Sequence, residues 1–247
     1  MQIHCLGTAG YHPNETRQTS CYFLPHQGLA LDAGSGVFRI GERLLTDELD
    51  ILLSHAHLDH VIGLTFLLDT HATTRLRKVR VWSEPRTIAA VREHVFASSI
   101  FPVMPDWIDW CPLTDRQFDV AGFRVTVIPL DHPGGSIGFR LDHADVSVAY
   151  ITDTTANPAA AYVQKIRRVD LLLHECNFND QQIEFAKMTG HSWTTAVAQV
   201  AVSAQVKRVL LTHMNPQADS AQSLGLEEFR RIYANAEMAT DGMVVEI

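Results

Sequence analysis

The feature that most constrains this chain is a dense group of ionisable side chains in residues 54–60, Ser-His-Ala-His-Leu-Asp-His. Three imidazoles and one carboxylate fall within six consecutive positions. Burying these groups side by side without a metal would leave polar atoms unsatisfied, at a cost of roughly 1–3 kcal/mol each. Histidine and carboxylate, without thiolate, are ligands that suit zinc, manganese or iron. The segment therefore predicts part of a metal site.

The residues around this group indicate a turn between a strand and a helix. The apolar run 51–53 precedes the group and is typical of a buried strand. Apolar residues recur through 61–68 with spacings of three and four, which predicts a helix. Side chains alternate along extended backbone, so His55 and His57 are expected to point to the same side. Their imidazoles can then converge on one point.

Asp59 and His60 lie one turn further along and are expected to face a second point nearby, so the segment is interpreted as half of a site for two metal ions. Further candidate ligands follow the ends of predicted strands: Asp32, His132, Asp153, His191 and His213. Strand ends gathered at one edge of a sheet sandwich would bring these groups together. The other histidines are interpreted as ordinary core or surface residues: His4, His12, His26, His71, His94, His143 and His174.

The strand pattern predicts two sheets in one domain, residues 1–247, with helices outside the sheets. Helices are predicted at 84–96 and from Ser192, as N-cap, to Gln205. The proline- and tryptophan-rich segment 101–112 is interpreted as a packed connection, with a lid as the alternative. Strands are predicted at residues 2–6, 21–24, 29–31, 51–53, 79–82, 123–129, 137–141, 146–151, 170–173, 206–211 and 243–247, in halves that divide near residue 120.

Composition excludes several functional classes. A net charge of -8 and a pI of about 5.9 argue against a large nucleic-acid footprint, which depends on Lys and Arg. The short basic cluster 75–80 is interpreted as a solvated strand edge. No apolar run approaches the roughly 20 residues that span a bilayer, and no signal peptide is recognisable, so a cytoplasmic location is expected. The four scattered cysteines are interpreted as buried free thiols.

The motif at 55–60 matches the H-x-H-x-D-H signature of the metallo-β-lactamase superfamily. Segments in the family's order resemble its ribonuclease Z-type branch: Leu6–Gly10, Leu31–Gly34, His132–Gly134, Ile151–Thr154, Leu173–Glu175, Gly190–Ser192 and Leu211–His213. The resemblance covers residues 3–216. It implies an α/β fold, a four-layer αβ/βα sandwich of two mixed β-sheets flanked by helices, and a two-metal hydrolytic centre.

The same resemblance implies roles for individual residues. One divalent ion is implied on His55, His57 and His132, and the other on Asp59, His60 and His213, with Asp153 bridging both. Zinc is the expected metal, with manganese and iron as alternatives. Asp32, which on local sequence alone equally suits a turn or helix cap, is implied to orient a ligand loop. Asp59 is additionally implied to receive a proton from water.

His191 resembles the branch's extra histidine, which protonates the leaving oxygen or stabilises the transition state. Glu175 resembles the carboxylate that orients this histidine, and its alternative interpretation is a salt bridge or turn contact. The pair favours a phosphodiester over the lactams and thioesters that other members of the superfamily hydrolyse.

Spacing bears on the substrate. Ribonuclease Z carries a long arm that grips tRNA between the positions matching His132 and Asp153. Here the interval is 153 − 132 = 21 residues, which leaves room for one hairpin. Together with the acidic charge, this favours a small phosphodiester, such as a cyclic nucleotide or a phosphoribosyl cyclic phosphate. The chain lacks the cysteine-rich zinc site typical of the phosphoribosyl-specific relatives.

Two alternatives from other classes stay open. One is a ribonuclease Z-type endonuclease that processes tRNA 3′ ends, with its binding surface supplied elsewhere, for instance by residues 75–80. The other is a non-hydrolytic metal-binding accessory protein. No membrane partner is expected, and a homodimer is expected to use the edge around 101–112.

Overall fold

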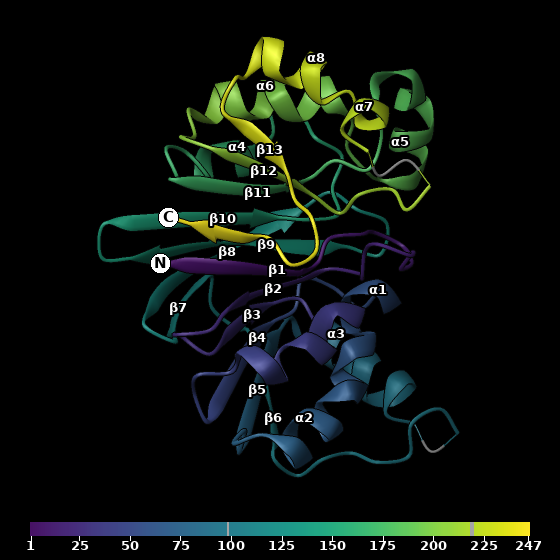
Figure 1. Ribbon diagram of the computed structural model, residues 1–247, viewed down its shortest axis with the longest axis vertical. Coiled ribbons are helices and arrows are strands. Elements are labelled where there is room, and N and C mark those ends of the chain that lie inside the picture. The colour runs from purple at the N-terminus through teal and green to yellow at the C-terminus, as the bar shows by residue number, and fades with distance from the viewer. Residues whose placement is uncertain (98, 218–219) are drawn as a thin grey trace. The chain divides into compact units, whose positions relative to one another are not determined.

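The computed structural model describes residues 1–97, 99–217 and 220–247. It divides into two compact units, each built on one seven-stranded sheet (Figure 1). The first unit consists of residues 1–116, 120–122 and 240–246, and the second of residues 117–119, 123–239 and 247. The predicted division into two sheets near residue 120 is confirmed.

The first sheet is mixed, because its last four strands run parallel and the others antiparallel. Its order is β14 (Val244–Glu246), β1 (Gln2–Gly7), β2 (Cys21–Leu24), β3 (Leu29–Leu31), β4 (Glu48–Leu52), β5 (Lys78–Ser83) and β6 (Ile108–Pro112). The pairs β3–β4, β4–β5 and β5–β6 are parallel. In β4 the last four residues are all buried, which accounts for the unbroken apolar run seen in the sequence.

The helices of the first unit are short. They are α1 (Leu58–Val61), α2 (Leu67–Thr73) and α3 (Pro85–Ala90), with single turns of other helix types at 35–39, 41–43, 62–66 and 91–95. The helix predicted through 61–68 is present as helical backbone, but residues 62–66 take the 3-10 form between α1 and α2. The N–H group of Gly63 donates to Ala33 O at 2.8 Å, outside the helix, and a Cβ on Gly63 would lie 2.1 Å from Gly34 O. This close backbone approach interrupts the helix.

The segment 101–112 packs against the core of the first unit, as expected. Phe101, Trp107 and Trp110 lie against its buried apolar cluster, and the ring of Trp107 stacks on His71 at 4.3 Å between centroids. The prediction did not include a strand here, yet residues 108–112 form β6. Buried and exposed residues do not alternate regularly along β6, which is the last strand of the first sheet.

The second sheet has a parallel half and an antiparallel half. Its order is β13 (Ala236–Met238), β12 (Val209–Thr212), β11 (Leu171–Glu175), β10 (Val146–Ile151), β9 (Ser136–His143), β8 (Phe123–Leu130) and β7 (Gln117–Val120). Strands β10 to β13 pair in parallel, whereas β8, β9 and β10 pair antiparallel. The expected hairpin between His132 and Asp153 is therefore formed by β9 and β10.

Helices of the second unit share a core with this sheet. They are α4 (Ala161–Lys165), α5 (Ile183–Thr189), α6 (Thr194–Ala204), α7 (Ala221–Leu224) and α8 (Leu226–Ile232), with a 3-10 turn at 180–182. Val197, Val200 and Ala201 of α6 are fully buried in that core. Ser192 was predicted as the N-cap of α6, but Trp193 holds that position. The hydroxyl of Ser192 instead donates to Thr154 O at 2.6 Å.

Within the part of the chain that the structure describes, none of the helices has the length and apolar character to cross a membrane.

Candidate metal centre

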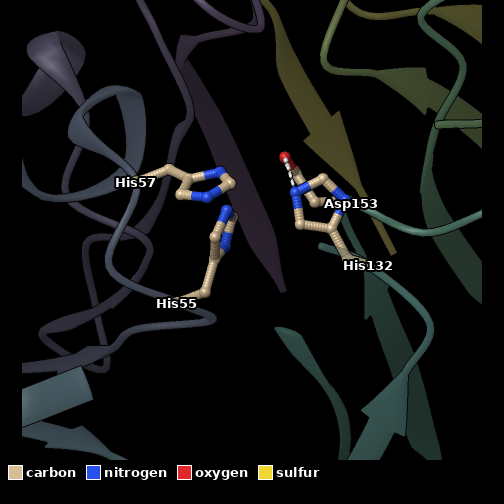
Figure 2. Close-up of side chains that lie close together, drawn as sticks. All are labelled: His55, His57, His132 and Asp153. Carbon is tan, nitrogen blue, oxygen red and sulfur yellow. Dashed lines mark ion pairs between the residues drawn. The ribbon is translucent and has the colours of Figure 1, made fainter. Parts of the chain in front are cut away.

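In the first unit the motif leaves β4 in extended backbone and then enters α1, so its imidazoles are held close together. The ring centroids of His55 and His57 lie 4.4 Å apart, and those of His55 and His60 lie 4.3 Å apart. Figure 2 shows the rings of His55 and His57 next to each other, with an interplanar angle of 70°. His55 and His60 are buried, whereas His57 is exposed. Such a concentration of nitrogen atoms suits a cation.

Asp32 supports this group from the end of β3, which pairs in parallel with β4. Its Oδ1 accepts the N–H group of Ser54 at 2.7 Å. Its Oδ2 accepts the Ser54 hydroxyl at 2.8 Å and lies 2.7 Å from Nδ1 of His60. Asp32 is fully buried and has a φ of 57°, in the left-handed region that aspartate and asparagine adopt more readily than most other residues. The carboxylate thereby fixes both the loop backbone and one imidazole.

Asp59 is held from two sides. Its Oδ2 accepts the backbone N–H group of Tyr11 at 2.7 Å and lies 3.3 Å from Nε2 of His60. The contact with Tyr11 comes from a loop 48 residues earlier in the chain. The carboxylate therefore has a defined position beside the imidazole.

In the second unit, parallel pairing of β10, β11 and β12 brings three strand ends together. Asp153 follows β10, Glu175 ends β11 and His213 follows β12. Oδ1 of Asp153 lies 3.2 Å from Nε2 of His213, and Oδ2 lies 3.7 Å from Nε2 of His132, the ion pair drawn as a dashed line in Figure 2. Each carboxylate oxygen thus faces a different imidazole. Ligand atoms of Asp153, His191 and His213 all lie within 4.8 Å of one another.

The hydrogen bonds of three imidazoles determine which ring nitrogen is available to a metal. Nδ1 of His132 lies 2.9 Å from Gly190 O, which can only accept, so Nδ1 carries the proton. Nδ1 of His60 donates to Asp32 for the same reason. The Ser54 hydroxyl donates to Asp32 and accepts from Nδ1 of His55 at 2.9 Å. Nε2 of each neutral ring then offers a lone pair, as metal-bound histidines require. The donor set therefore fits divalent metal.

Glu175 and His191 form a separate arrangement in the second unit. Glu175 is fully buried, and Nδ1 of His191 lies 3.0 Å from its Oε1. Oε1 also accepts the N–H group of Thr154 at 2.9 Å, and Oε2 accepts that of Ser192 at 3.1 Å. Burial by itself would raise the pKa of Glu175, but the attraction of His191 outweighs it, so the pKa lies below its ordinary value. A charged carboxylate thus orients the imidazole.

His174 behaves as an ordinary core histidine, in agreement with the prediction. Its Nδ1 donates to Glu175 O at 2.7 Å, and its Nε2 lies 3.1 Å from the Tyr162 hydroxyl. Burial lowers the pKa of His174, which favours the neutral ring. Both ring nitrogens are therefore occupied inside the protein.

Several supporting groups were not predicted from the sequence. The Nδ2 atom of Asn177 lies 3.2 Å from Nδ1 of His213 and donates to His213 O at 3.1 Å. Thr152 donates to Oδ1 of Asp153 at 2.6 Å. The contacts of Tyr11 N–H with Asp59 and of Gly190 O with His132 use backbone atoms, so the amino-acid types at these positions do not reveal them. Ser54 was recognisable only as part of the motif.

Comparison with known proteins agrees with this geometry. Residues 30–214 match the family model described as "Beta-lactamase superfamily domain". The chain belongs to the metallo-β-lactamase superfamily. The prediction of this superfamily, and of its ribonuclease Z-like branch, is confirmed, and with it the prediction of a hydrolase enzyme. The superfamily fold and the histidine and aspartate cluster together indicate divalent metal binding.

Two curated relatives illustrate the sequence similarity. The chain is 26% identical to "Ribonuclease Z" of Gemmatimonas aurantiaca, covering 99% of this chain and 95% of the relative. It is 25% identical to "Ribonuclease Z" of Archaeoglobus fulgidus, covering 100% of this chain and 97% of the relative.

Solved structures establish the αβ/βα fold class of the superfamily. The metallo-β-lactamase fold protein YhfI from Bacillus subtilis superimposes with a TM-score of 0.83 at 21% identity, covering 99% of both chains. Human tRNase Z, short form, superimposes with a TM-score of 0.77 at 21% identity, and the match covers 100% of this chain and 99% of that protein. A diphosphatase from the PhnP family gives 0.76 at 18% identity, covering 100% of this chain and 97% of its own. The predicted fold class is confirmed.

Proposed function

We propose that this chain is a dinuclear metal-dependent phosphodiesterase acting as one catalytic domain. The observation that carries the phosphodiester assignment is the buried Glu175 holding His191 beside Asp153 and His213. This arrangement offers a proton donor next to the carboxylate of Asp153, and such a donor assists the departure of an alkoxide from a phosphodiester. The name of the curated relatives, "Ribonuclease Z", supports the same chemistry.

The proposed ligand set follows the superfamily pattern. By that pattern His55, His57 and His132 would hold one ion, Asp59, His60 and His213 would hold the other, and Asp153 would be shared by both. The two oxygens of Asp153, each facing a different imidazole, support the bridging role. We propose zinc, with manganese or iron as alternatives, because the donors are nitrogen and oxygen without thiolate.

Two divalent ions, when bound, would supply positive charge to the phosphate oxygens and acidify a water molecule toward a pKa of about 7. The protein's own groups then handle protons. Asp59, fixed by Tyr11 N–H, receives the proton of the attacking water. His191 donates a proton from Nε2 to the leaving oxygen, while Glu175 keeps the opposite nitrogen protonated and stabilises the imidazolium.

For the substrate, the comparisons favour the ribonuclease Z alternative over the small phosphodiester that was preferred from the sequence. The two curated relatives described above and human tRNase Z carry that activity in their names. Residues 75–80 offer weak support as a tRNA-binding surface. Lys78 pairs with Asp109 at 2.8 Å and Arg80 pairs with Glu48 at 2.6 Å, so both cations are already partly neutralised.

A small phosphodiester stays the second candidate because of two observations. The interval between His132 and Asp153 contains only the hairpin β9–β10. The match to the Gemmatimonas relative extends over 305 positions against 247 residues here, so at least 305 − 247 = 58 positions have no counterpart in this chain. The short hairpin and the 58 unmatched positions both agree with the absence of a tRNA-binding arm from this interval.

One experiment separates the candidates. Purified protein loaded with zinc or manganese is assayed on bis(p-nitrophenyl) phosphate, a panel of cyclic phosphates and precursor tRNA, with metal content measured. Cleavage of precursor tRNA at its 3′ end would support the ribonuclease. Turnover of a cyclic phosphate with no tRNA cleavage would support the small-molecule enzyme. Absence of turnover on every substrate would contradict the phosphodiesterase proposal.

A cytoplasmic location and a homodimer stay predictions from the sequence.

A further inference from the structure

Tyr11 combines three properties that a purely structural residue does not need. Its backbone N–H group donates to Oδ2 of Asp59 at 2.7 Å. Its φ is 64°, in the left-handed region that favours glycine. Its side chain is 80% exposed, whereas Tyr22 and Tyr150 are fully buried. An aromatic ring is therefore displayed to solvent from the residue that fixes the proposed catalytic carboxylate.

The loop that carries Tyr11 is held firmly by hydrogen bonds. Asn14 Oδ1 accepts the N–H groups of Thr16 and Arg17, both at 2.9 Å. Gln18 N–H donates to Oδ2 of Asp241 at 2.7 Å. Arg17 is buried, and its guanidinium group donates to the Thr8 hydroxyl. These contacts fix the loop after Tyr11, and the N–H group of His12 donates to Gly10 O at 2.8 Å, so the backbone on both sides of Tyr11 is held.

Bond lengths limit how far the Tyr11 ring can lie from the carboxylate of Asp59. The Cα atom of Tyr11 is about 1.5 Å from the nitrogen that binds Asp59. The Tyr11 ring therefore lies within about 8 Å of the Asp59 carboxylate, a distance that a nucleoside group could span. Leu58, which immediately precedes Asp59, is 65% exposed and adds apolar surface. The ring of His12 contacts Tyr11 at 5.2 Å in an edge arrangement, and most of the Tyr11 ring stays open.

We propose that Tyr11 is a stacking platform for the base of a nucleoside phosphodiester, and so determines substrate specificity. This inference rests on the proposed phosphodiesterase function and names its substrate class. Aromatic side chains bind bases through their π-faces with little dependence on base identity. The backbone N–H group of Tyr11 positions Asp59 whatever the side chain, so substitutions at this residue change stacking and leave that hydrogen bond in place.

The test compares two esters with the same leaving group, thymidine 5′-(p-nitrophenyl) phosphate and methyl p-nitrophenyl phosphate. Tyr11→Leu is expected to lower kcat/KM for the thymidine ester by about 5- to 150-fold. The methyl ester, which has no base, should change by less than about twofold. Tyr11→Phe retains the ring and should behave like wild type. Equal losses on both esters, or a loss on neither, would overturn the proposal.

A binding measurement distinguishes failure of this inference from failure of the phosphodiesterase function. Calorimetric titration with 5′-AMP and with inorganic phosphate needs no turnover. Tyr11→Leu should weaken AMP binding by a similar factor and leave phosphate binding unchanged, even if wild type hydrolyses neither ester. If AMP binds wild type no better than phosphate does, or binds both proteins equally, Tyr11 is not a base platform.

Discussion

Nδ1 of His191 lies 3.0 Å from Oε1 of Glu175, a fully buried carboxylate whose other oxygen accepts the backbone N–H group of the residue that follows His191. Glu175 therefore holds both the ring and the main chain at this position. The imidazole cannot rotate without losing a charge-assisted hydrogen bond inside the protein. This arrangement supplies the proton donor of the proposed reaction.

The variant His191→Ala tests that role. Its kcat should fall by about 10²–10⁴-fold on esters with an alkoxide leaving group, which needs a proton to depart. The loss on bis(p-nitrophenyl) phosphate should be much smaller, because p-nitrophenolate leaves unprotonated. Metal content should stay near that of wild type. The half-buried His143, on β9, provides the control variant His143→Ala, with both activities retained. Equal losses of H191A on both kinds of ester would contradict proton donation.

The variant Asp32→Asn should weaken metal binding. Asp32 orients the motif loop through three hydrogen bonds, and residues that orient metal ligands typically contribute 10- to 100-fold to metal affinity. Asparagine retains the size of the side chain and tolerates a positive φ. Competition with a chromophoric chelator measures the affinity.

Asp50 provides the matched control for Asp32. It is a buried aspartate of the same sheet, but its carboxylate pairs with Arg80 at 2.7 Å. Asp50→Asn should lower thermal stability and leave metal affinity unchanged. If both variants lose affinity equally, Asp32 acts through general stability rather than through ligand orientation.

Removal of metal should reduce both activity and stability. Ligands that bind only the folded state stabilise it by mass action, by about 2.7 kcal/mol when the free metal is at 100 times its Kd. Dialysis against a chelator is therefore expected to abolish turnover and lower Tm, and titration with zinc or manganese should restore both. Calorimetric scans over a range of free metal concentrations would show the dependence. A Tm independent of metal would argue against a bound ion at this cluster.

Asp170 should make stability depend on acid pH. Burial would raise its pKa, but the hydrogen bond from Lys207 at 2.6 Å and those from Ser147 outweigh burial, so the pKa lies below 3.8. A lowered pKa in the folded state contributes stability at pH values above the unfolded pKa, and this stability is lost as pH falls through the folded pKa.

Asp170→Asn should therefore destabilise the protein by about 1 kcal/mol near neutrality. The difference from wild type should shrink as pH falls below about 4. Denaturant unfolding at several pH values measures both effects. A difference that stays constant down to acid pH would contradict the role of the charged carboxylate.

The local pattern was enough for the strand-to-helix turn and for the placement of His55 and His57 on one side, because both depend only on the alternation of extended backbone. It did not foresee the 3-10 stretch at 62–66, where Gly63 approaches Gly34 and the regular α-helix is interrupted. It also failed at Ser192, whose hydroxyl bonds to Thr154 rather than capping α6. Both errors came from contacts between segments distant in sequence, which local periodicity does not contain.

The sequence by itself indicated the chemistry of this protein, since three imidazoles and one carboxylate at 54–60 predict metal ligands whatever fold surrounds them. The tertiary structure decided how those side chains are held. The parallel register of β3 with β4 brings Asp32 to Ser54 and His60, and that of β10, β11 and β12 brings Glu175 level with Asp153 and His213. Register is set by packing across whole sheets, so no short stretch of sequence encodes it.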